Sequence, residues 1–417
     1  MNTDLLTVDF EKRIESWVVR GVRMGAGSFD DLLVRLPGVY PPLLRAAIER
    51  LKMRELIPAS LSEKLLQTRV HFMSSGADPC PMPMEHPLDY DWRFTSETVD
   101  CLIEQFSLLG EDGPLMCLGT PSVFDRMWFR DHRTILFDRN DLIINYFRKL
   151  DSGAEAFRVN LVSDKIPRGI AGAVILDPPW YPEYMDLFLW SAAQVLKPNG
   201  IALASFPPEG TRPECFKENK DIISRVRHYG LEKEGIDKGA VLYRTPNFER
   251  NSLAANNINL GGLSWRKGNL ILFRLARRIE HKRPIIQDSY TCWKPYHVRG
   301  LSLRVKDSYQ FGFCDPRLNN LVCGDVLPSV SRRDPIRKRA MVWTTGNRVF
   351  ACNGSNTLRH IIEILQIQEN DFLYELGNRM NLRLSQRQRD QVKIAVEQIF
   401  NLVDLETSET KMNWITN

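Results

Sequence analysis

The chain has 417 residues, of which 43% are hydrophobic, and its formal net charge at pH 7 is +5. This length and composition suffice for one large core or two to three smaller ones, and they exclude a low-complexity chain. No apolar stretch is long enough to span a bilayer, and residues 1–4 lack the pattern of a signal peptide, so we expect a cytoplasmic protein without a membrane partner. The modest charge permits a polyanionic partner without demanding one.

Cysteine and histidine residues give no indication of a metal site. The 8 cysteines are scattered, without a pair at the short spacing of zinc or redox motifs, so we expect reduced thiols. The 7 histidines are dispersed and also lack metal-ligand spacing. We therefore predict no bound metal.

Residues 1–72 are predicted to form a helical module. Residues 10–22 are amphipathic, Ser28 begins a capping-box pattern, and two prolines at positions 41 and 42 open a helix that extends to residue 56. A short helix, a turn and a second helix in this order resemble a winged-helix module. Such modules bind DNA in some proteins and dock partner proteins in others, and both alternatives stay open.

A Pro-rich segment, residues 73–90, is predicted to be a linker, and residues 91–284 then alternate between helices and strands. This alternation predicts the fold class, an α/β, Rossmann-like, doubly wound and mostly parallel sheet whose last two strands close one edge. The predicted strands lie at residues 114–118, 134–137, 157–162, 173–176, 201–206, 239–243 and 269–273. The predicted helices lie at residues 95–109, 141–150 and 185–196.

Residues 285–417 are predicted to form a separate, mixed α+β domain. We expect this domain to help recognise the acceptor, the molecule on which the central domain acts. Strand-like pieces at 301–305, 341–344 and 348–352 precede helices at 357–366 and 385–402. A basic stretch before Trp343 combines charge with an aromatic ring, as contacts with phosphates and bases require, although a solvated loop has the same composition. This candidate nucleic-acid-binding set is Arg332, Arg333, Arg337, Lys338 and Arg339.

The most informative motif is Asp177-Pro178-Pro179-Trp180, which directly follows the apolar run 173–176. It places an acid, two rigid prolines and an aromatic ring at the carboxyl end of a buried strand, where open α/β sheets bind their ligands. Tyr181 follows and adds a second ring. A stiff turn beside a packed tryptophan has the same sequence pattern, and the surroundings favour a site. We predict that these five residues form the catalytic cluster.

Gly119 ends the first predicted strand and Asp138 ends the second. The glycine permits a close backbone approach, and a carboxylate at the adjacent strand tip can accept both hydroxyls of a ribose. The loop continues with Thr120 and Pro121 and lacks the phosphate-cradling glycines of a dinucleotide site. Together with Asp164, a candidate contact to the adenine, these residues predict a nucleoside cofactor without phosphates, namely S-adenosyl-L-methionine.

The DPPW motif, the single-glycine loop and Asp138 together resemble the N6-adenine type of class I S-adenosylmethionine-dependent methyltransferases, over roughly residues 91–275. The resemblance implies that the acid and the carbonyl of Pro178 accept hydrogen bonds from the amino group to be methylated. It further implies that Trp180 or Tyr181 stacks on a flipped base. The favoured prediction is therefore an N-methyltransferase that acts on an exocyclic amine, adenine N6 in DNA or RNA.

Three alternatives remain open at this stage. The loop at residues 119–124 is similar to that of a subset of methyltransferases that includes protein-lysine methyltransferases, which implies a protein acceptor. The order of a winged helix and a Rossmann-like domain with Asp-Pro-Pro is similar to the branched-chain polyamine synthases, which transfer aminopropyl from decarboxylated S-adenosylmethionine. Their acidic run after the first strand is absent after Gly119. A non-catalytic domain that senses a nucleotide or scaffolds partners is the third alternative.

Overall fold

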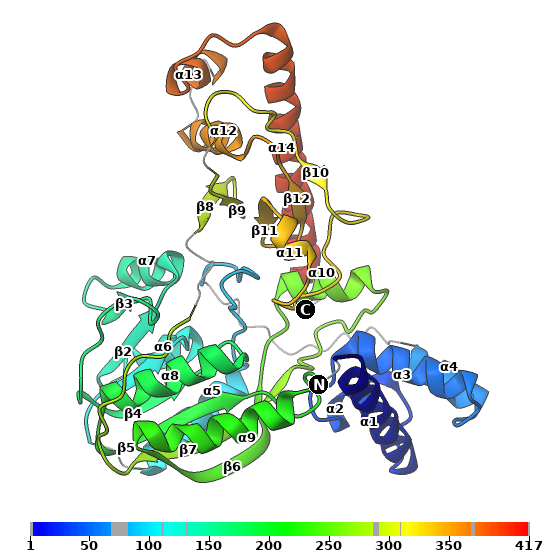
Figure 1. The fold of residues 1–417 in the computed structure, drawn as a ribbon, viewed down its shortest axis with the longest axis vertical. Helices are drawn as coiled ribbons and strands as arrows, with labels where there is room; N and C mark the ends of the chain where they lie inside the picture. Colours follow the sequence, from blue (N-terminus) through cyan, green and yellow to red (C-terminus); the bar gives the residue numbers. More distant parts are fainter. Residues whose placement is uncertain are drawn as a thin grey trace.

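The structure is a computed structural model that describes residues 3–67, 82–109, 112–130, 132–286, 292–308, 310–367 and 372–415. Figure 1 shows three parts: a group of N-terminal helices, a central layered α/β domain, and a C-terminal domain that extends away from the central sheet. Within the described residues, no helix is both long and apolar enough to cross a membrane.

The N-terminal part is a module of helices only. The Oγ of Ser28 accepts a hydrogen bond from the backbone N of Asp31 at 3.1 Å and caps the second helix, as the sequence pattern predicts. The core of the module includes Leu253 and Trp265 of the central domain, so the two parts pack together. The helical module is confirmed, but residues 3–67 contain no strand and therefore form no wing. Its helices are α1 (Thr3–Arg23), α2 (Phe29–Arg35), α3 (Pro41–Met53) and α4 (Ala59–Leu66).

The central sheet has seven strands in the order β3-β2-β1-β4-β5-β7-β6. Strands β1 to β5 pair in parallel, and β7 runs antiparallel to both β5 and β6. This confirms the predicted Rossmann-like, doubly wound sheet that two final strands close. The strands are β1 (Leu115–Leu118), β2 (Thr134–Asp138), β3 (Ala156–Arg158), β4 (Ala171–Leu176), β5 (Leu196–Phe206), β6 (Leu231–Leu242) and β7 (Lys267–Leu275).

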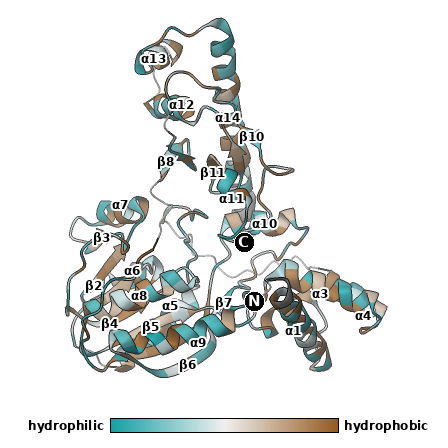
Figure 2. Ribbon diagram, in the orientation of Figure 1, coloured by the Kyte–Doolittle hydropathy of each residue, from teal (hydrophilic) through white to brown (hydrophobic). Residues whose placement is uncertain are grey.

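Helices cover both faces of this sheet. Met116 and Leu118 of β1 belong to the core beneath α8 and α9, whereas Leu115 and Cys117 belong to the core beneath α5, α6 and α7, because successive side chains of a strand point to opposite faces. All residues of β4 are buried. The edge strand β6 is largely exposed and is mostly hydrophilic in Figure 2. The helical elements are α5 (Ser96–Leu109), α6 (Pro121–Met127), α7 (Asp141–Leu150), α8 (Pro182–Val195), α9 (Cys215–Arg225), the 3₁₀ helix η1 (Val226–Tyr229) and α10 (Asn247–Ala255).

The C-terminal domain is mixed α+β, as predicted. Its antiparallel sheet has the order β10-β12-β11-β9-β8, and its core lies between this sheet and the final helices. The strands are β8 (Trp293–Val298), β9 (Leu301–Lys306), β10 (Asn319–Asn320), β11 (Val342–Thr344) and β12 (Val349–Ala351). The helices are α11 (Ile336–Arg339), α12 (Ser355–Ile367), α13 (Phe372–Arg379) and α14 (Gln386–Ile415).

The sheet order places the predicted motif at a topological switch point. The chain runs outward from β1 to β2 and β3 and then returns to β4 on the other side of β1. In open α/β sheets a ligand crevice opens at the carboxyl ends of the two strands at this point. Gly119 follows β1 there and Asp177 follows β4, and the backbone N of Asp177 donates to the carbonyl oxygen of Leu118 at 3.3 Å.

Candidate active site

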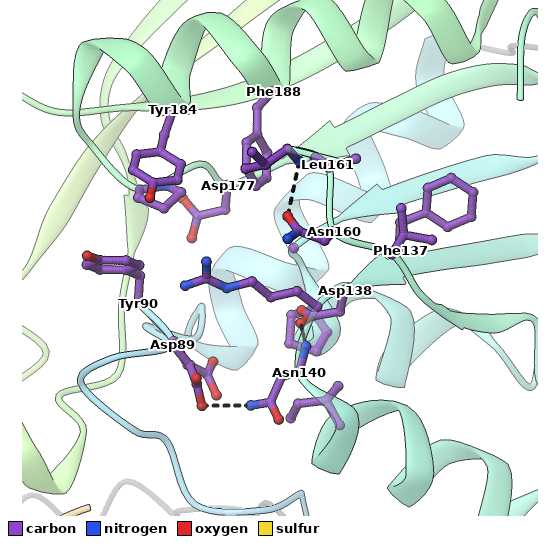
Figure 3. Close-up of a pocket in the computed structure, with 18 of the residues that line it drawn as sticks. Asp89, Tyr90, Phe137, Asp138, Asn140, Asn160, Leu161, Asp177, Tyr184 and Phe188 are labelled. Atoms are coloured by element: carbon purple, nitrogen blue, oxygen red, sulfur yellow. Dashed lines mark hydrogen bonds between the residues drawn. The ribbon is translucent and has the colours of Figure 1, made fainter. Parts of the chain in front are cut away.

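Two pockets meet at Asp177. The first lies over the tips of β1, β2 and β4 (Figure 3). The second is lined by all three parts of the chain. We call them the sheet-tip pocket and the interdomain pocket. Asp177 and Pro179 line both, together with Tyr90 and Trp92 from the segment that precedes the central domain.

Gly119 brings the backbone close to the other strand tip. Its φ is +63°, in the left-handed region that favours glycine, and a Cβ there would lie 3.3 Å from Cε1 of Phe188 and 3.6 Å from the carbonyl oxygen of Asp177. Pro121 at the start of α6 also lines the sheet-tip pocket. Thr120 is buried, and its Oγ1 donates to the carbonyl oxygen of Ile175 at 3.3 Å, so it joins β1 to β4 and does not line the pocket.

A short chain of hydrogen bonds fixes the acidic wall of the sheet-tip pocket. The backbone N of Asn140 donates to Oδ1 of Asp138 at 2.8 Å, and its side-chain Nδ2 donates to Oδ2 of Asp89 at 3.1 Å. Nη2 of Arg304, on β9 of the C-terminal domain, donates to the same Asp89 oxygen at 2.7 Å. Both side chains of this ion pair are almost fully buried, at 2% and 3% exposure. Figure 3 shows Asp89, Asn140 and Asp138 along one side of the pocket.

The buried and acidic surroundings of Asp138 raise the pKa of its carboxyl group. Burial raises the pKa of its carboxyl to about 7, and the neighbouring carboxylates of Asp91 and Asp89 also favour the neutral form. The hydrogen bond from Asn140 opposes the shift. Asp138 is thus a group near its titration midpoint at neutral pH, in a pocket that Asp89, Asp91 and Asp177 also line.

Asp177 is hydrogen-bonded to two hydroxyl groups, one on β5 and one on the residue that follows β6. The hydroxyl of Tyr243 donates to its Oδ1 at 2.7 Å, and the Oγ of Ser205, at the end of β5, lies 2.5 Å from that hydroxyl. Burial raises the pKa of Asp177 to about 7, while the hydrogen bonds from Tyr243 and Ser205 act in the opposite direction. Groups with such shifted pKa values inside a pocket are characteristic of sites that handle protons.

Trp180 stands at the junction of aromatic and cationic side chains in the interdomain pocket. Its ring meets that of Tyr243 edge to face at 5.4 Å, and the Arg266 guanidinium lies 5.9 Å from its ring centroid. Arg266 forms a buried ion pair with Glu249 and lies 4.9 Å from the ring of Trp92, whose Nε1 also donates to Glu249 at 2.9 Å. Arg266 and Glu249 therefore fix the positions of the Trp92 and Trp180 rings in the pocket lining.

Tyr181 lies at the rim of the same pocket. Its hydroxyl oxygen accepts a hydrogen bond from the backbone N of Arg332 at 2.9 Å, which ties the motif to the C-terminal domain. Of the predicted basic set, Arg332 and Arg333 reach this rim. Lys338 and Arg339 are exposed elsewhere on α11. Arg337 instead lies 4.4 Å from the ring centroid of Trp343, which is fully buried, so that ring packs in the core and is not available to stack on a base.

Asp164 lies outside the lining of both pockets. Its carboxylate accepts hydrogen bonds from the backbone N of Asn160 at 2.9 Å and from the Oγ of Ser163 at 2.8 Å. It thereby shapes the turn that presents Asn160 and Leu161 to the sheet-tip pocket (Figure 3).

Sequence reasoning missed several residues of the site. Residues 82–90 of the predicted linker are packed in the structure, and residues 89–92 line the sheet-tip pocket. His86 is buried, and its Nε2 lies 3.2 Å from the carbonyl oxygen of Trp343. Residues 73–81 lie outside the described residues. The sequence does carry one signal, since the acidic and aromatic run Asp89-Tyr90-Asp91-Trp92 is unusual for a Pro-rich linker.

The fold and the two pockets define the chain as a Rossmann-like α/β protein with a composite site. No protein-family model and no curated protein matches the sequence. The fold is similar to that of the branched-chain polyamine synthase from Thermus thermophilus, whose structure holds N4-aminopropylspermidine and 5′-methylthioadenosine. That protein is 12% identical, with a TM-score of 0.52, and the match covers 70% of this chain and 98% of that one.

Two further structures are similar. The C9 mutein of the same synthase is 11% identical, with a TM-score of 0.52, over 70% of this chain and 97% of that one. A Galdieria sulphuraria protein described as a sarcosine dimethylglycine methyltransferase is 12% identical, with a TM-score of 0.32, over 43% of this chain and 86% of that one. At these identities the likeness to the synthase structures establishes the Rossmann-like fold alone.

Proposed function

We propose that the protein is an S-adenosylmethionine-dependent methyltransferase that acts on an exocyclic amine, adenine N6 in DNA or RNA. The observation that carries the proposal is the meeting of two unlike pockets at Asp177. The sheet-tip pocket is lined by four carboxylates, and the interdomain pocket by aromatic rings and guanidinium groups. A cationic donor suits the first, and a flat, electron-rich acceptor suits the second.

The residues of the sheet-tip pocket fit the cofactor. The carboxylate of Asp138 at the end of β2 can accept hydrogen bonds from both ribose hydroxyls, and Gly119 leaves room for a close backbone approach. Carboxylates in the lining stabilise a positive charge. When bound there, S-adenosylmethionine supplies a methyl group on a cationic sulfonium.

The residues at the junction would orient the acceptor. The Asp177 carboxylate accepts a hydrogen bond from one N–H of the amine, and the Pro178 carbonyl accepts the other, so the nitrogen lone pair points to the sheet-tip pocket. Trp180 provides a flat surface for the ring that carries the amine. Asp177, once ionised, also provides an acceptor for the proton that the nitrogen loses after methylation. Positioning of this kind accounts for much of the rate enhancement in bimolecular reactions.

Aminopropyl transfer to a polyamine is the second candidate, because the polyamine synthase structures share the fold over most of their length. The lining of the interdomain pocket speaks against a polycationic acceptor. Arg212, Arg266 and Arg333 line it, whereas Asp177 is the one carboxylate among its described lining residues. A protein-lysine acceptor, a cation at neutral pH, meets the same repulsion.

Calorimetry followed by a transfer assay tests the proposal. The full-length protein is titrated with S-adenosylmethionine, its demethylated product and its decarboxylated form, and is then incubated with adenine-containing nucleic acid and labelled cofactor. Saturable binding of the first two and label in N6-methyladenine support the proposal. Preference for the decarboxylated form supports aminopropyl transfer, and label in protein lysine supports that alternative. If none of the three ligands binds, the proposal that the protein is an S-adenosylmethionine-dependent enzyme is refuted.

Cofactor affinity is expected to fall as the pH falls through about 7. The pKa of Asp138 is raised to about 7, and ribose hydroxyls donate to its ionised form, so protonation competes with binding. The dissociation constant should rise about tenfold for each pH unit below the pKa. Calorimetry between pH 5.5 and 8.5 measures this, and Asp138→Asn should flatten the curve. A pH-independent wild-type affinity would contradict the assignment of Asp138 to the ribose.

Tyr243→Phe is expected to move the acidic limb of the rate profile to higher pH. The hydroxyl stabilises the ionised form of Asp177, so its removal raises the pKa of that carboxyl further above its value of about 7. The rate at neutral pH should fall roughly tenfold and recover in part at higher pH. The measurement is kcat against pH. A uniform loss at every pH would show that the Tyr243 hydroxyl does not act through the ionisation of Asp177.

A further inference from the structure

Three guanidinium groups surround Tyr181 at the rim of the interdomain pocket. The guanidinium carbons of Arg212, Arg332 and Arg333 lie 5.5, 5.8 and 5.9 Å from its ring centroid. Arg212 comes from the loop after β5, whereas Arg332 and Arg333 come from the C-terminal domain. Two parts of the chain that are distant in sequence thus place positive charge around one aromatic ring.

The carboxylates that face this cluster do not balance it. Arg332 pairs with Glu183 at 2.8 Å, while Glu218 is shared by Arg212 and, at 3.4 Å, Arg333. Among the described residues, two carboxylates therefore pair with three guanidinium groups. Arg333 has the longest pair distance of the three, and its side chain is 55% exposed. This is the guanidinium that an incoming anion can recruit with the least structural change.

The interdomain pocket offers a ligand more than one contact surface. Tyr181 and Arg333 lie in the same lining as Trp180, so a ligand seated on Trp180 has a second aromatic and cationic surface beside it. Stacking on aromatic rings with phosphate contacts from arginine is how proteins bind single strands.

We propose that the Tyr181 cluster is a subsite for the phosphodiester and base that flank the target, so that the acceptor is single-stranded nucleic acid. The placement of the target amine at Asp177 rests on the proposed function. The subsite itself rests on the rings and charges around Tyr181. A single strand suits the pocket because its unpaired bases can stack on Trp180 and Tyr181 while Arg333 contacts a phosphate.

Binding and transfer measurements with matched nucleic acids test the subsite. The probes are adenosine, adenosine 5′-monophosphate, a 12-nucleotide single strand of DNA or of RNA with one adenine, and the matching duplexes. The variants are Arg333→Gln and Arg212→Gln/Arg333→Gln, with Lys338→Gln/Arg339→Gln as a control that removes equal charge from α11. Glu218→Gln removes the shared carboxylate and keeps both arginines.

We expect wild-type protein to bind the single strands at least tenfold more tightly than the duplexes. The double arginine variant should weaken single-strand binding roughly tenfold or more, and should reduce the slope of log affinity against log salt by about 0.7, the value for one lost phosphate contact. Glu218→Gln should tighten binding ~3-fold because it frees two guanidinium groups. The control should retain wild-type affinity, and adenosine binding should be the same in every variant.

Different results would contradict the subsite and the proposed function. A preference for duplex, an unchanged salt slope in both arginine variants, or an equal effect on unphosphorylated adenosine would overturn the subsite. Arg333→Gln alone guards against misfolding, because its side chain is half exposed while Arg212 and Glu218 are mostly buried. If the wild-type protein binds single strands but transfers no methyl group to them, the proposed function is wrong and the subsite proposal is still supported. Comparison of DNA with RNA identifies the polymer.

Discussion

Asp177→Asn is expected to lower the rate of methyl transfer about 1,000-fold while the cofactor still binds. The carboxylate lies where the two pockets meet, and it accepts a hydrogen bond from Tyr243 on one side. An amide in its place keeps the shape but carries less negative charge to hold the amine and accept its proton. A loss of about 1,000-fold corresponds to about 4 kcal/mol of transition-state stabilisation, in the range for one charged group in an active site.

Single-turnover rates with saturating cofactor measure this loss, and calorimetry confirms cofactor binding. Asp125→Asn is the matched control, because Asp125 is a partly buried carboxyl of the same domain that lines neither pocket. It should transfer methyl groups at the wild-type rate. A fully active Asp177→Asn protein would refute the proposed role of the motif.

Arg304→Met is expected to weaken cofactor binding at least tenfold, although Arg304 lines neither pocket. The guanidinium holds Asp89, Asp89 holds the Asn140 amide, and the Asn140 backbone holds Asp138. Removal of one partner of a buried ion pair leaves the other charge uncompensated, at a typical cost of about 3–5 kcal/mol. We expect Asp89 to turn toward water and the proposed ribose site at Asp138 to lose its fixed geometry.

The readout separates positioning from general destabilisation. Arg304→Met should raise the KM for the cofactor with little change in kcat, Arg304→Lys should restore part of the affinity, and a cycle with Asp89→Asn should show strong coupling. Arg359→Met is the control, since Arg359 pairs with Asp307 in the same domain and lines neither pocket. Equal losses in both arginine variants would mean that Arg304 only stabilises the C-terminal domain.

The central fold could be predicted because its signals are local. The apolar runs that became β1, β2 and β4 are short and bounded by glycine or aspartate, and the helices between them have a polar and an apolar face. Strand order then follows from general rules for parallel sheets. The same local signals predicted that Gly119, Asp138 and Asp177 lie at one edge of the sheet. In the structure these three residues line one pocket.

The rest of the site depends on contacts between distant residues, which periodicity does not encode. Arg304 meets Asp89 across 215 positions, and Tyr181 meets Arg332 across 151. A sequence shows that these side chains are charged or aromatic, but not which of them share a cavity. Two arginines of the basic stretch illustrate this limit. Arg333 lines the interdomain pocket, whereas Arg337, four residues later, packs against the ring of Trp343.

The segment 82–93 makes the protein's parts interdependent. Leu88 sits in a core cluster with Trp293 and Trp343 of the C-terminal domain, and four residues further on Trp92 lines both pockets. A fragment cut at the boundaries 91 and 284 would keep the sheet and the DPPW motif, yet it would lose Asp89 and Arg304 together. The two pockets therefore depend on all three parts of the chain, and exchange of either flanking part for that of another protein would disrupt a site whose motif residues all lie in the middle.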